Sequence, residues 1–218
     1  MQVLSRRVDR VAIVDDDEFA RESWAFTIED ADLEGVGEEG PLPSIDEFTA
    51  HVADTADAVV CDWQLKVSNY AQYNGEQLVA SLYQSGIPAL LCTRWDKARV
   101  DEIRSYRQYI PVLMRPDELN PDSLVDGLST AIAELDGELQ PERRPWRTLV
   151  RVVEVYEDEG RAYVEIPAWP LSEIITLRLP DIPVPIRQLM AAGSRCHAKV
   201  NIGAERSEDL YFLDWEPE

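Results

Sequence analysis

Short apolar runs alternate with amphipathic segments in the first part of the chain. The runs have the length and composition of buried β-strands, and they occupy residues 11–14, 33–36, 58–61, 88–92 and 110–114. Helical periodicity and capping signals predict the intervening helices at residues 17–30, 44–53, 75–84, 95–107 and 121–135. Five strands that alternate with five helices predict a parallel sheet covered by helices on both faces.

The pattern changes after residue 148, where strand-like alternation takes over. About five strands and one short helical pattern ending at Gly193 predict a small all-β barrel of the OB or SH3 type over residues 149–218. Residues 138–148 mix charge and proline and are interpreted as a linker to a first domain at residues 1–137. No helix-turn-helix pattern is present, so DNA binding by that motif is not expected.

Composition narrows the range of functions. The formal net charge is −21, and residues 1–141 hold 28 acids against 11 bases, which opposes electrostatic binding to nucleic acid. No apolar run is long enough to span a membrane, so we expect a soluble protein that is not exported. The three cysteines lie far apart and are interpreted as reduced core residues. The chain has only two histidines, so a histidine-based metal site or a Ser-His-Asp catalytic triad is not expected.

Acidic residues follow the first and third predicted strands. Asp15, Asp16 and Asp17 come directly after residues 11–14, and Asp62 follows residues 58–61. Acids in such places often cap the next helix, and Asp17 is a candidate for that role. Because neighbouring parallel strands end at one edge of the sheet, Asp15, Asp16 and Asp62 are expected to share a pocket. A carboxylate cluster of this kind favours Mg²⁺ as its counter-ion.

Two further side chains are expected at the same edge. Thr93 follows the fourth strand and supplies a hydroxyl, and Arg115 follows the fifth and supplies a permanent cation. A carboxylate, a metal site, a hydroxyl and a cation together suit transfer of a phosphoryl group to an aspartate.

The segments VAIVDDDE, AVVCDW, LLCT and LMRP resemble, in order and spacing, the sequence blocks of bacterial response-regulator receiver domains over residues 8–136. The resemblance implies an α/β flavodoxin-like (βα)5 fold and a cytoplasmic phosphoprotein. By that resemblance Asp62 is the phosphoacceptor, and Asp15 and Asp16 hold Mg²⁺ together with the backbone carbonyl of Gln64. Thr93 and Arg115 take the positions that contact the phosphoryl group.

The resemblance also implies partners: a histidine kinase or phosphotransfer protein, and a downstream protein, with a homodimer left open. The expected function is two-component signalling without enzymatic turnover beyond self-dephosphorylation.

Four departures from the family pattern affect this interpretation. Arg115 stands where the family usually has Lys, and Arg94 stands where it commonly has a small residue. Val112 replaces the usual switching aromatic residue. The loop WQLKVSNYAQYNG after Asp62 is longer than usual and carries two tyrosines that could cover the site or bind a partner. These departures predict a non-standard output.

Three alternatives stay open at this point. The first domain could be a receiver-like scaffold that is not phosphorylated. The C-terminal barrel, for which protein binding is preferred, could instead bind single-stranded nucleic acid through Arg143, Arg144, Arg147, Arg151 and Trp146. A phosphatase acting through Asp62 would need a second acid-base residue nearby.

Overall fold

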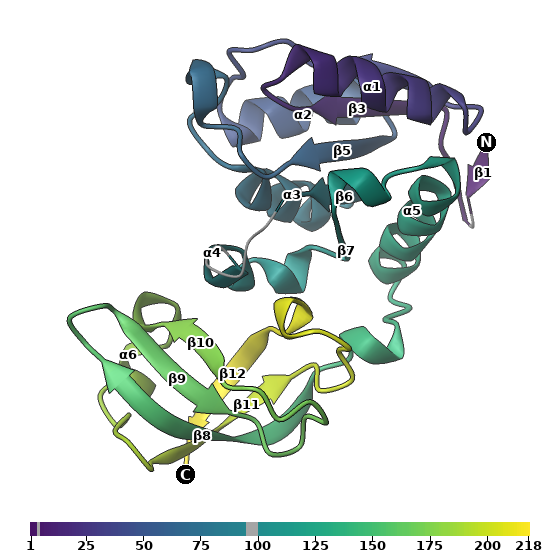
Figure 1. The fold of residues 1–218 in the computed structure, drawn as a ribbon. Helices are drawn as coiled ribbons and strands as arrows, with labels where there is room; N and C mark the ends of the chain where they lie inside the picture. Colours follow the sequence, from purple (N-terminus) through teal and green to yellow (C-terminus); the bar gives the residue numbers. More distant parts are fainter. Residues whose placement is uncertain (4, 95–99) are drawn as a thin grey trace. The chain divides into compact units, whose positions relative to one another are not determined.

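The computed structural model describes residues 1–3, 5–94 and 100–218, which group into two compact units (Figure 1). Of the described residues, 1–3, 5–94 and 109–138 form the first unit, and 100–108 and 139–218 form the second. The first unit contains β1 (Gln2–Val3), β2 (Arg6–Arg7), β3 (Arg10–Val14), α1 (Glu18–Glu29), β4 (Glu34–Gly37), α2 (Ile45–Thr55), β5 (Ala58–Asp62), η1 (Val67–Asn69), α3 (Gly75–Gln84), β6 (Ala89–Cys92), β7 (Val112–Met114), η3 (Pro116–Glu118) and α5 (Pro121–Leu135).

The first unit has a parallel sheet with the strand order β4-β3-β5-β6-β7. In order along the chain this is 2-1-3-4-5, the flavodoxin-like arrangement. α1 packs with α5 and α2 packs with α3, and the two pairs cover opposite faces of the sheet. The predicted five-stranded parallel sheet is therefore confirmed.

The sequence explains these elements locally. Central strand residues such as Val11, Ile13, Val60 and Leu90 are fully buried, because helices cover both faces. The predicted capping box forms at α2, where the Ser44 side chain accepts the backbone N–H of Glu47 and the Glu47 carboxylate accepts the backbone N–H of Ser44. Burial on both faces and helix capping thus alternate along the chain, and the carboxyl ends of the strands lie together at one edge of the sheet.

The second unit is built on an antiparallel sheet with the order β10-β9-β8-β11-β12. Its elements are α4 (Val100–Arg104), part of η2 (Arg107–Tyr109), η4 (Pro141–Arg143), β8 (Trp146–Tyr156), β9 (Arg161–Glu165), β10 (Ile175–Arg178), η5 (Leu179–Asp181), α6 (Val184–Arg187), β11 (Arg195–Val200), η6 (Ser207–Asp209) and β12 (Phe212–Pro217). The predicted all-β character is confirmed, and the OB or SH3 type of barrel stays a prediction. β8 begins at Trp146, within the segment predicted as a linker.

Residues 100–108 lie between β6 and β7 in the chain but cluster with the C-terminal sheet. The helix predicted at residues 95–107 falls partly on residues 95–99, which lie outside the described residues; α4 covers Val100–Arg104. Arg104 Nη1 donates to the carbonyls of Ser207, at 2.8 Å, and Leu210, at 2.9 Å. The predicted division into domains stays a prediction.

Arg107 and Arg143 add to this attachment. Arg107 Nη2 lies 2.8 Å from Asp209 Oδ1, and both side chains are largely buried. Arg143, from η4, donates through Nη1 to the carbonyl of Arg107 and through Nη2 to that of Gln108, at 2.9 and 3.1 Å. Charge-assisted hydrogen bonds of this kind are stronger than neutral ones, so they fix residues 104–108 to the second unit.

Two expectations about the chain as a whole can be compared with the structure. Cys61, Cys92 and Cys196 are all buried and unpaired, as predicted. Across the residues that the structure describes, every helix is too short or too polar to cross a membrane.

Candidate functional site

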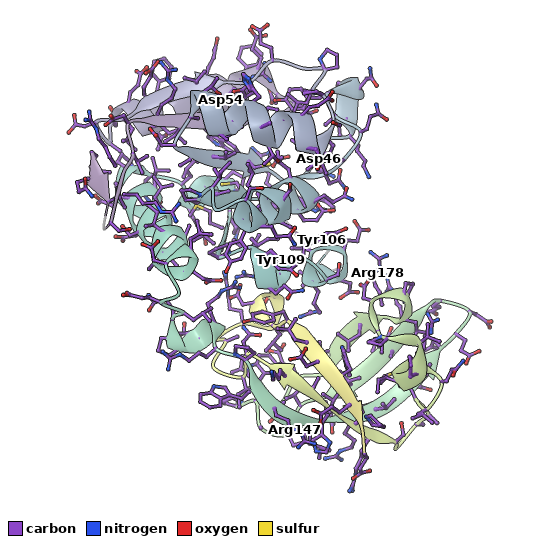
Figure 2. The ribbon with its side chains drawn as sticks, turned by 180° about the vertical axis from the view of Figure 1, so that it is seen from behind. Asp46, Asp54, Tyr106, Tyr109, Arg147 and Arg178 are labelled. Atoms are coloured by element: carbon purple, nitrogen blue, oxygen red, sulfur yellow. The ribbon has the colours of Figure 1, made fainter. Side chains whose placement is uncertain are left out.

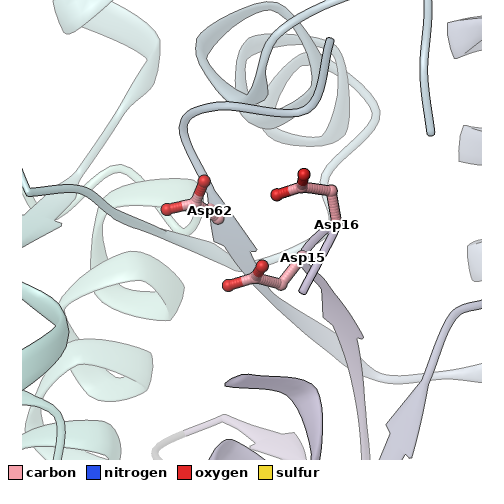
Figure 3. A group of neighbouring side chains, drawn as sticks. All are labelled: Asp15, Asp16 and Asp62. Atoms are coloured by element: carbon pink, nitrogen blue, oxygen red, sulfur yellow. The ribbon is translucent and has the colours of Figure 1, made fainter. Parts of the chain in front are cut away.

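Three aspartates gather at the carboxyl edge of the parallel sheet (Figure 3). Asp15 and Asp16 follow β3, and Asp62 is the last residue of β5, which pairs with β3 through Val14 and Cys61. One carboxylate oxygen from each residue lies within 4.8 Å of the others. The convergence predicted from the strand ends is therefore seen in the structure.

The local hydrogen bonds separate the roles of the aspartate triplet. Asp17 is the N-cap of α1, and its Oδ1 accepts the backbone N–H of Phe19 at 3.0 Å. Asp15 Oδ1 accepts the backbone N–H of Asp17 at 2.8 Å, which holds the Asp15 side chain at the start of the helix. The capping role considered for Asp17 is confirmed, and Asp15 and Asp16 are left to face Asp62.

Asp62 is fixed by its neighbours on the sheet. Its Oδ2 accepts the backbone N–H of Gln64 at 2.7 Å. The next residue, Trp63, donates its backbone N–H to the carbonyl of Cys92 at 3.0 Å, which ties the end of β5 to β6. The prediction that the carbonyl of Gln64 completes a metal shell stays a prediction.

Gly75 allows α3 to begin against Asp62. A Cβ at this position would lie 2.0 Å from the backbone oxygen of Asp62, and the Gly75 N–H donates to the carbonyl of Trp63 at 2.9 Å. Only a residue without a Cβ fits such a close approach of two backbones. The first residue of α3 therefore lies against the backbone of Asp62.

The three carboxyl groups resist ionisation together. Burial raises the pKa of Asp15 to about 7, and the nearby charges of Asp62 and Asp16 add to the shift, which the hydrogen bond from Asp17 opposes. Burial also raises the pKa values of Asp16 and Asp62. Carboxylates crowded in this way are typical of sites for a hard divalent cation with oxygen ligands. The donor set fits Mg²⁺ by its chemistry.

Thr93 lies at the same edge of the sheet and is buried. Its backbone N–H donates to the carbonyl of Met114 at 3.0 Å, which links the end of β6 to β7. Asp62 and Thr93 thus follow two neighbouring strands that pair through Asp62 and Cys92. The role assigned to the Thr93 hydroxyl stays a prediction.

The two candidate cations differ in their surroundings. Arg115 is 58% exposed, its Nε lies 3.3 Å from Asp117 Oδ1, and its backbone N–H donates to Glu118. Arg94 is the cation whose charge lowers the pKa of Asp62, against the larger effect of burial. The assignment of Arg115 to the phosphoryl contact stays a prediction, and Arg94 is a second candidate.

The sequence did not identify Arg21, at the end of the first turn of α1, as part of this region. Its Nη1 donates to the backbone carbonyl of Asp15 at 2.6 Å, and its guanidinium lies over the Tyr70 ring at 5.7 Å from the centroid. Its charge lowers the pKa of Asp16, against the larger effect of burial. The only available signal was its spacing of four residues from the helix cap Asp17.

The long loop after Asp62 packs into the first unit. Tyr70 and Tyr73 are both buried, and the Tyr70 hydroxyl donates to the carbonyl of Glu38 at 2.8 Å. Leu42 donates its backbone N–H to the Tyr70 carbonyl at 2.6 Å. The tyrosine rings are therefore core contacts of the loop, which leaves little of either ring for binding a partner.

Comparison with solved structures finds receiver domains that are similar to part of this chain. A response regulator receiver domain protein from Clostridium thermocellum is 13% identical, with a TM-score of 0.44, and covers 59% of this chain and 98% of its own. A CheY-like receiver from Methanospirillum hungatei is 17% identical, with a TM-score of 0.44 and coverages of 61% and 99%. The receiver domain of an HD domain-containing protein from Pseudomonas fluorescens is 15% identical, with a TM-score of 0.43 and coverages of 61% and 93%. No protein-family model and no curated protein matches the chain.

Proposed function

We propose that this chain is a response regulator that accepts a phosphoryl group on Asp62. The observation that carries the proposal is the convergence of Asp15, Asp16 and Asp62, with carboxylate oxygens within 4.8 Å of one another. Crowded carboxylates destabilise a fold unless a bound cation or a function compensates for them. A phosphoacceptor beside a metal site gives such a function.

The transfer would begin with attack by a carboxylate oxygen of Asp62 on the phosphorus of a phosphohistidine. A P–O bond forms as the P–N bond breaks, and the imidazole leaves with the electron pair and takes up a proton. Oδ2 of Asp62 accepts a hydrogen bond from the Gln64 amide, and we assign the role of nucleophile to Oδ1. Mg²⁺ held by Asp15, Asp16 and Asp62, and by the Gln64 carbonyl, would neutralise charge on the transferring oxygens.

Thr93 and an arginine would stabilise the new charge. Thr93 follows β6, the strand that pairs with β5 through Asp62 and Cys92, and we expect its hydroxyl to donate to a phosphoryl oxygen. Arg115 is the cation that sequence order favours, and Arg94 is the cation that already acts on the pKa of Asp62. Either guanidinium can form two parallel hydrogen bonds to a phosphoryl group.

The partners follow from this chemistry. The phosphoryl donor would be a histidine kinase or phosphotransfer protein, and the chain would act in the cytoplasm. No turnover of an external substrate is expected, because the acyl phosphate would only hydrolyse on the chain itself. A downstream protein would bind the C-terminal unit in a way that depends on phosphorylation. A second copy of the chain is a further candidate partner.

Residues 100–108 offer a route for the output. They follow Thr93 closely in sequence and are fixed to the C-terminal sheet by Arg104, Arg107 and Arg143. A change at Thr93 would therefore act on a segment that belongs to the second unit. Because Val112 replaces the usual aromatic switch, this route would not require an aromatic rotation.

A receiver-like scaffold that is not phosphorylated is the second candidate. The observation in its favour is that the Arg115 guanidinium is exposed and paired with Asp117. In that case the carboxylates would serve only to bind a cation.

The test is the mass of the intact protein after incubation with Mg²⁺ and acetyl phosphate. We expect one phosphoryl adduct on the wild type and none on Asp62→Asn. The matched control is Asp54→Asn, which changes an exposed aspartate on α2 (Figure 2) and should leave the adduct unchanged. The scaffold would be favoured if the wild type stays unmodified with acetyl phosphate and with phosphorylated histidine kinases.

A further inference from the structure

A single side chain, Arg21, contacts both the pair of acids after β3 and the long loop at residues 63–74. Its Nη1 donates at 2.6 Å to the backbone carbonyl of Asp15, which belongs to the peptide that joins Asp15 to Asp16. The same guanidinium lies over the Tyr70 ring, 5.7 Å from the ring centroid. Arg21 therefore connects the backbone between the two acids to an aromatic ring of the loop.

The Arg21 side chain is held on more than one side. Its backbone N–H donates to the carbonyl of Asp17 at 3.0 Å, in the first turn of α1. A Cβ on Gly37 would lie 3.6 Å from Cδ of Arg21, so the end of β4 runs beside the aliphatic part of the side chain. A planar guanidinium can donate to a carbonyl and stack on an aromatic ring at the same time. Loss of either contact would leave the guanidinium less well oriented for the other.

Tyr70 is the residue through which the loop packs onto the first unit. The residue is 5% exposed, and its hydroxyl donates to the carbonyl of Glu38 at 2.8 Å. Its own carbonyl accepts the backbone N–H of Leu42 at 2.6 Å. A Cβ on Gly40 would overlap the Tyr70 ring, so this ring packs directly against backbone. The contact with Arg21 is therefore made only while the loop is packed in this way.

The loop also contains backbone that must be held in place. Ser68 and Asn69, directly before Tyr70, have φ values of 55° and 56°, in the left-handed region. Residues other than glycine adopt this conformation at a cost, and they keep it only where the surrounding structure holds them. Both side chains are exposed, so the packing that holds this backbone comes from buried neighbours such as Tyr70. Loss of one buried contact should therefore release the loop readily.

We propose that Arg21 is a positioning residue that couples packing of the long loop to cation binding at the three aspartates of the site. The packed Tyr70 ring holds the guanidinium on the Asp15 carbonyl, and this hydrogen bond fixes the peptide between Asp15 and Asp16. A cation held by these acids fixes the same peptide and so favours the packed loop, because coupling between two sites is reciprocal. The inference rests on the proposed function, which assigns Mg²⁺ to these acids.

The test is a double-mutant cycle on Mg²⁺ binding, measured by calorimetry with the full chain. Tyr70→Leu removes the ring, and Arg21→Lys keeps the charge but loses the planar guanidinium. We expect each single variant to weaken Mg²⁺ binding about threefold or more. The double variant should bind Mg²⁺ as the weaker single variant does, because both changes break one connection. Losses that simply multiply in the double variant would overturn the coupling.

Two control variants separate the ring contact from general damage to the loop. Tyr70→Phe keeps the ring and should bind Mg²⁺ within about twofold of the wild type. Tyr73→Leu truncates the other buried tyrosine of the loop, and its effect should be the same in the wild type and in Arg21→Lys. A loss in Tyr70→Phe as large as that in Tyr70→Leu would assign the effect to the hydroxyl and contradict the role of Arg21.

Hydrogen exchange measures the coupling in the opposite direction. The Leu42 amide reports packing of the loop because it donates to the Tyr70 carbonyl. Mg²⁺ should slow exchange of this amide about threefold or more in the wild type but not in Arg21→Lys. The Asp57 amide, which donates to the carbonyl of Arg10 at the amino end of the sheet, is the reference. Equal slowing of the Leu42 amide in both proteins would refute the proposal.

The outcomes also separate this coupling from the proposed function. A wild type that binds no Mg²⁺ would overturn both the coupling and the metal site. Mg²⁺ binding with a non-additive cycle but without an acyl phosphate would support the coupling and contradict only phosphorylation.

Discussion

Arg107 and Asp209, 102 positions apart in the sequence, form a largely buried ion pair of 2.8 Å. The pair joins the segment between β6 and β7 to the turn before β12. Removing one partner of a buried pair leaves the other charge uncompensated. Asp209→Asn should therefore lower the free energy of unfolding by about 3 kcal/mol, measured by urea denaturation. Glu205→Gln, at an exposed site near the same turn, should change it little.

The ion pair of Arg107 and Asp209 predicts that the stability of the fold depends on pH in the acidic range. Burial acts to raise the pKa of Asp209, but Arg107 and Arg206 hold it below the ordinary 3.8. A carboxyl group with a lowered pKa contributes stability above its ordinary pKa and loses that contribution as the pH falls through the folded value. The difference in stability between the wild type and Asp209→Asn should be constant above pH 5 and should shrink below about pH 4. A difference that grows in acid would be incompatible with this pairing.

Gly75 should be essential for the site because its backbone meets that of Asp62. In Gly75→Ala the new Cβ would lie 2.0 Å from the Asp62 oxygen, so the start of α3 or the end of β5 must shift. We expect a loss of about 2 kcal/mol or more in stability, together with loss of phosphorylation by acetyl phosphate. Gly37→Ala is the matched control, since its Cβ would make only ordinary contacts, at 3.6 Å or more. Unchanged phosphorylation in Gly75→Ala would refute this role.

Asp15 should make the metal-free protein sensitive to pH. Burial raises its pKa from 3.8 to about 7, so the stability it contributes is complete below about pH 4 and is lost as the pH rises to 7. The change is at most about 4 kcal/mol, and contact with solvent makes it smaller. Asp15→Asn should be more stable than the wild type at pH 8 in a chelating buffer and should gain less from added Mg²⁺. Thermal unfolding with and without Mg²⁺ measures both effects.

The part of the site that is formed by residues at strand ends could be predicted from the sequence. Asp15, Asp16 and Asp62 could be placed together because parallel strands end at one edge, and Asp17 was a recognisable helix cap. Arg21 was not predictable in the same way. Its contact with the Asp15 carbonyl uses a group that every residue has, and its contact with the Tyr70 ring requires the long loop to pack near α1.

The grouping of residues 100–108 with the C-terminal sheet could not be predicted from the sequence pattern. Periodicity predicts a helix near this segment but does not say which sheet it joins. The attachment depends on backbone carbonyls of Ser207 and Leu210 as acceptors for Arg104, and every residue has such a carbonyl. Likewise, the charged and proline-rich residues that predict a linker include Trp146, the first residue of β8.

The most direct test of the central claim is to locate the phosphoryl group on the chain. An aspartyl phosphate is reduced by borohydride to homoserine, which marks the modified position in peptide mass spectra. After incubation with Mg²⁺ and a phosphoryl donor, we predict homoserine at position 62, and none at positions 15 or 16. A phosphoryl group found at another residue, or none on any aspartate with acetyl phosphate and phosphorylated histidine kinases, would contradict the account.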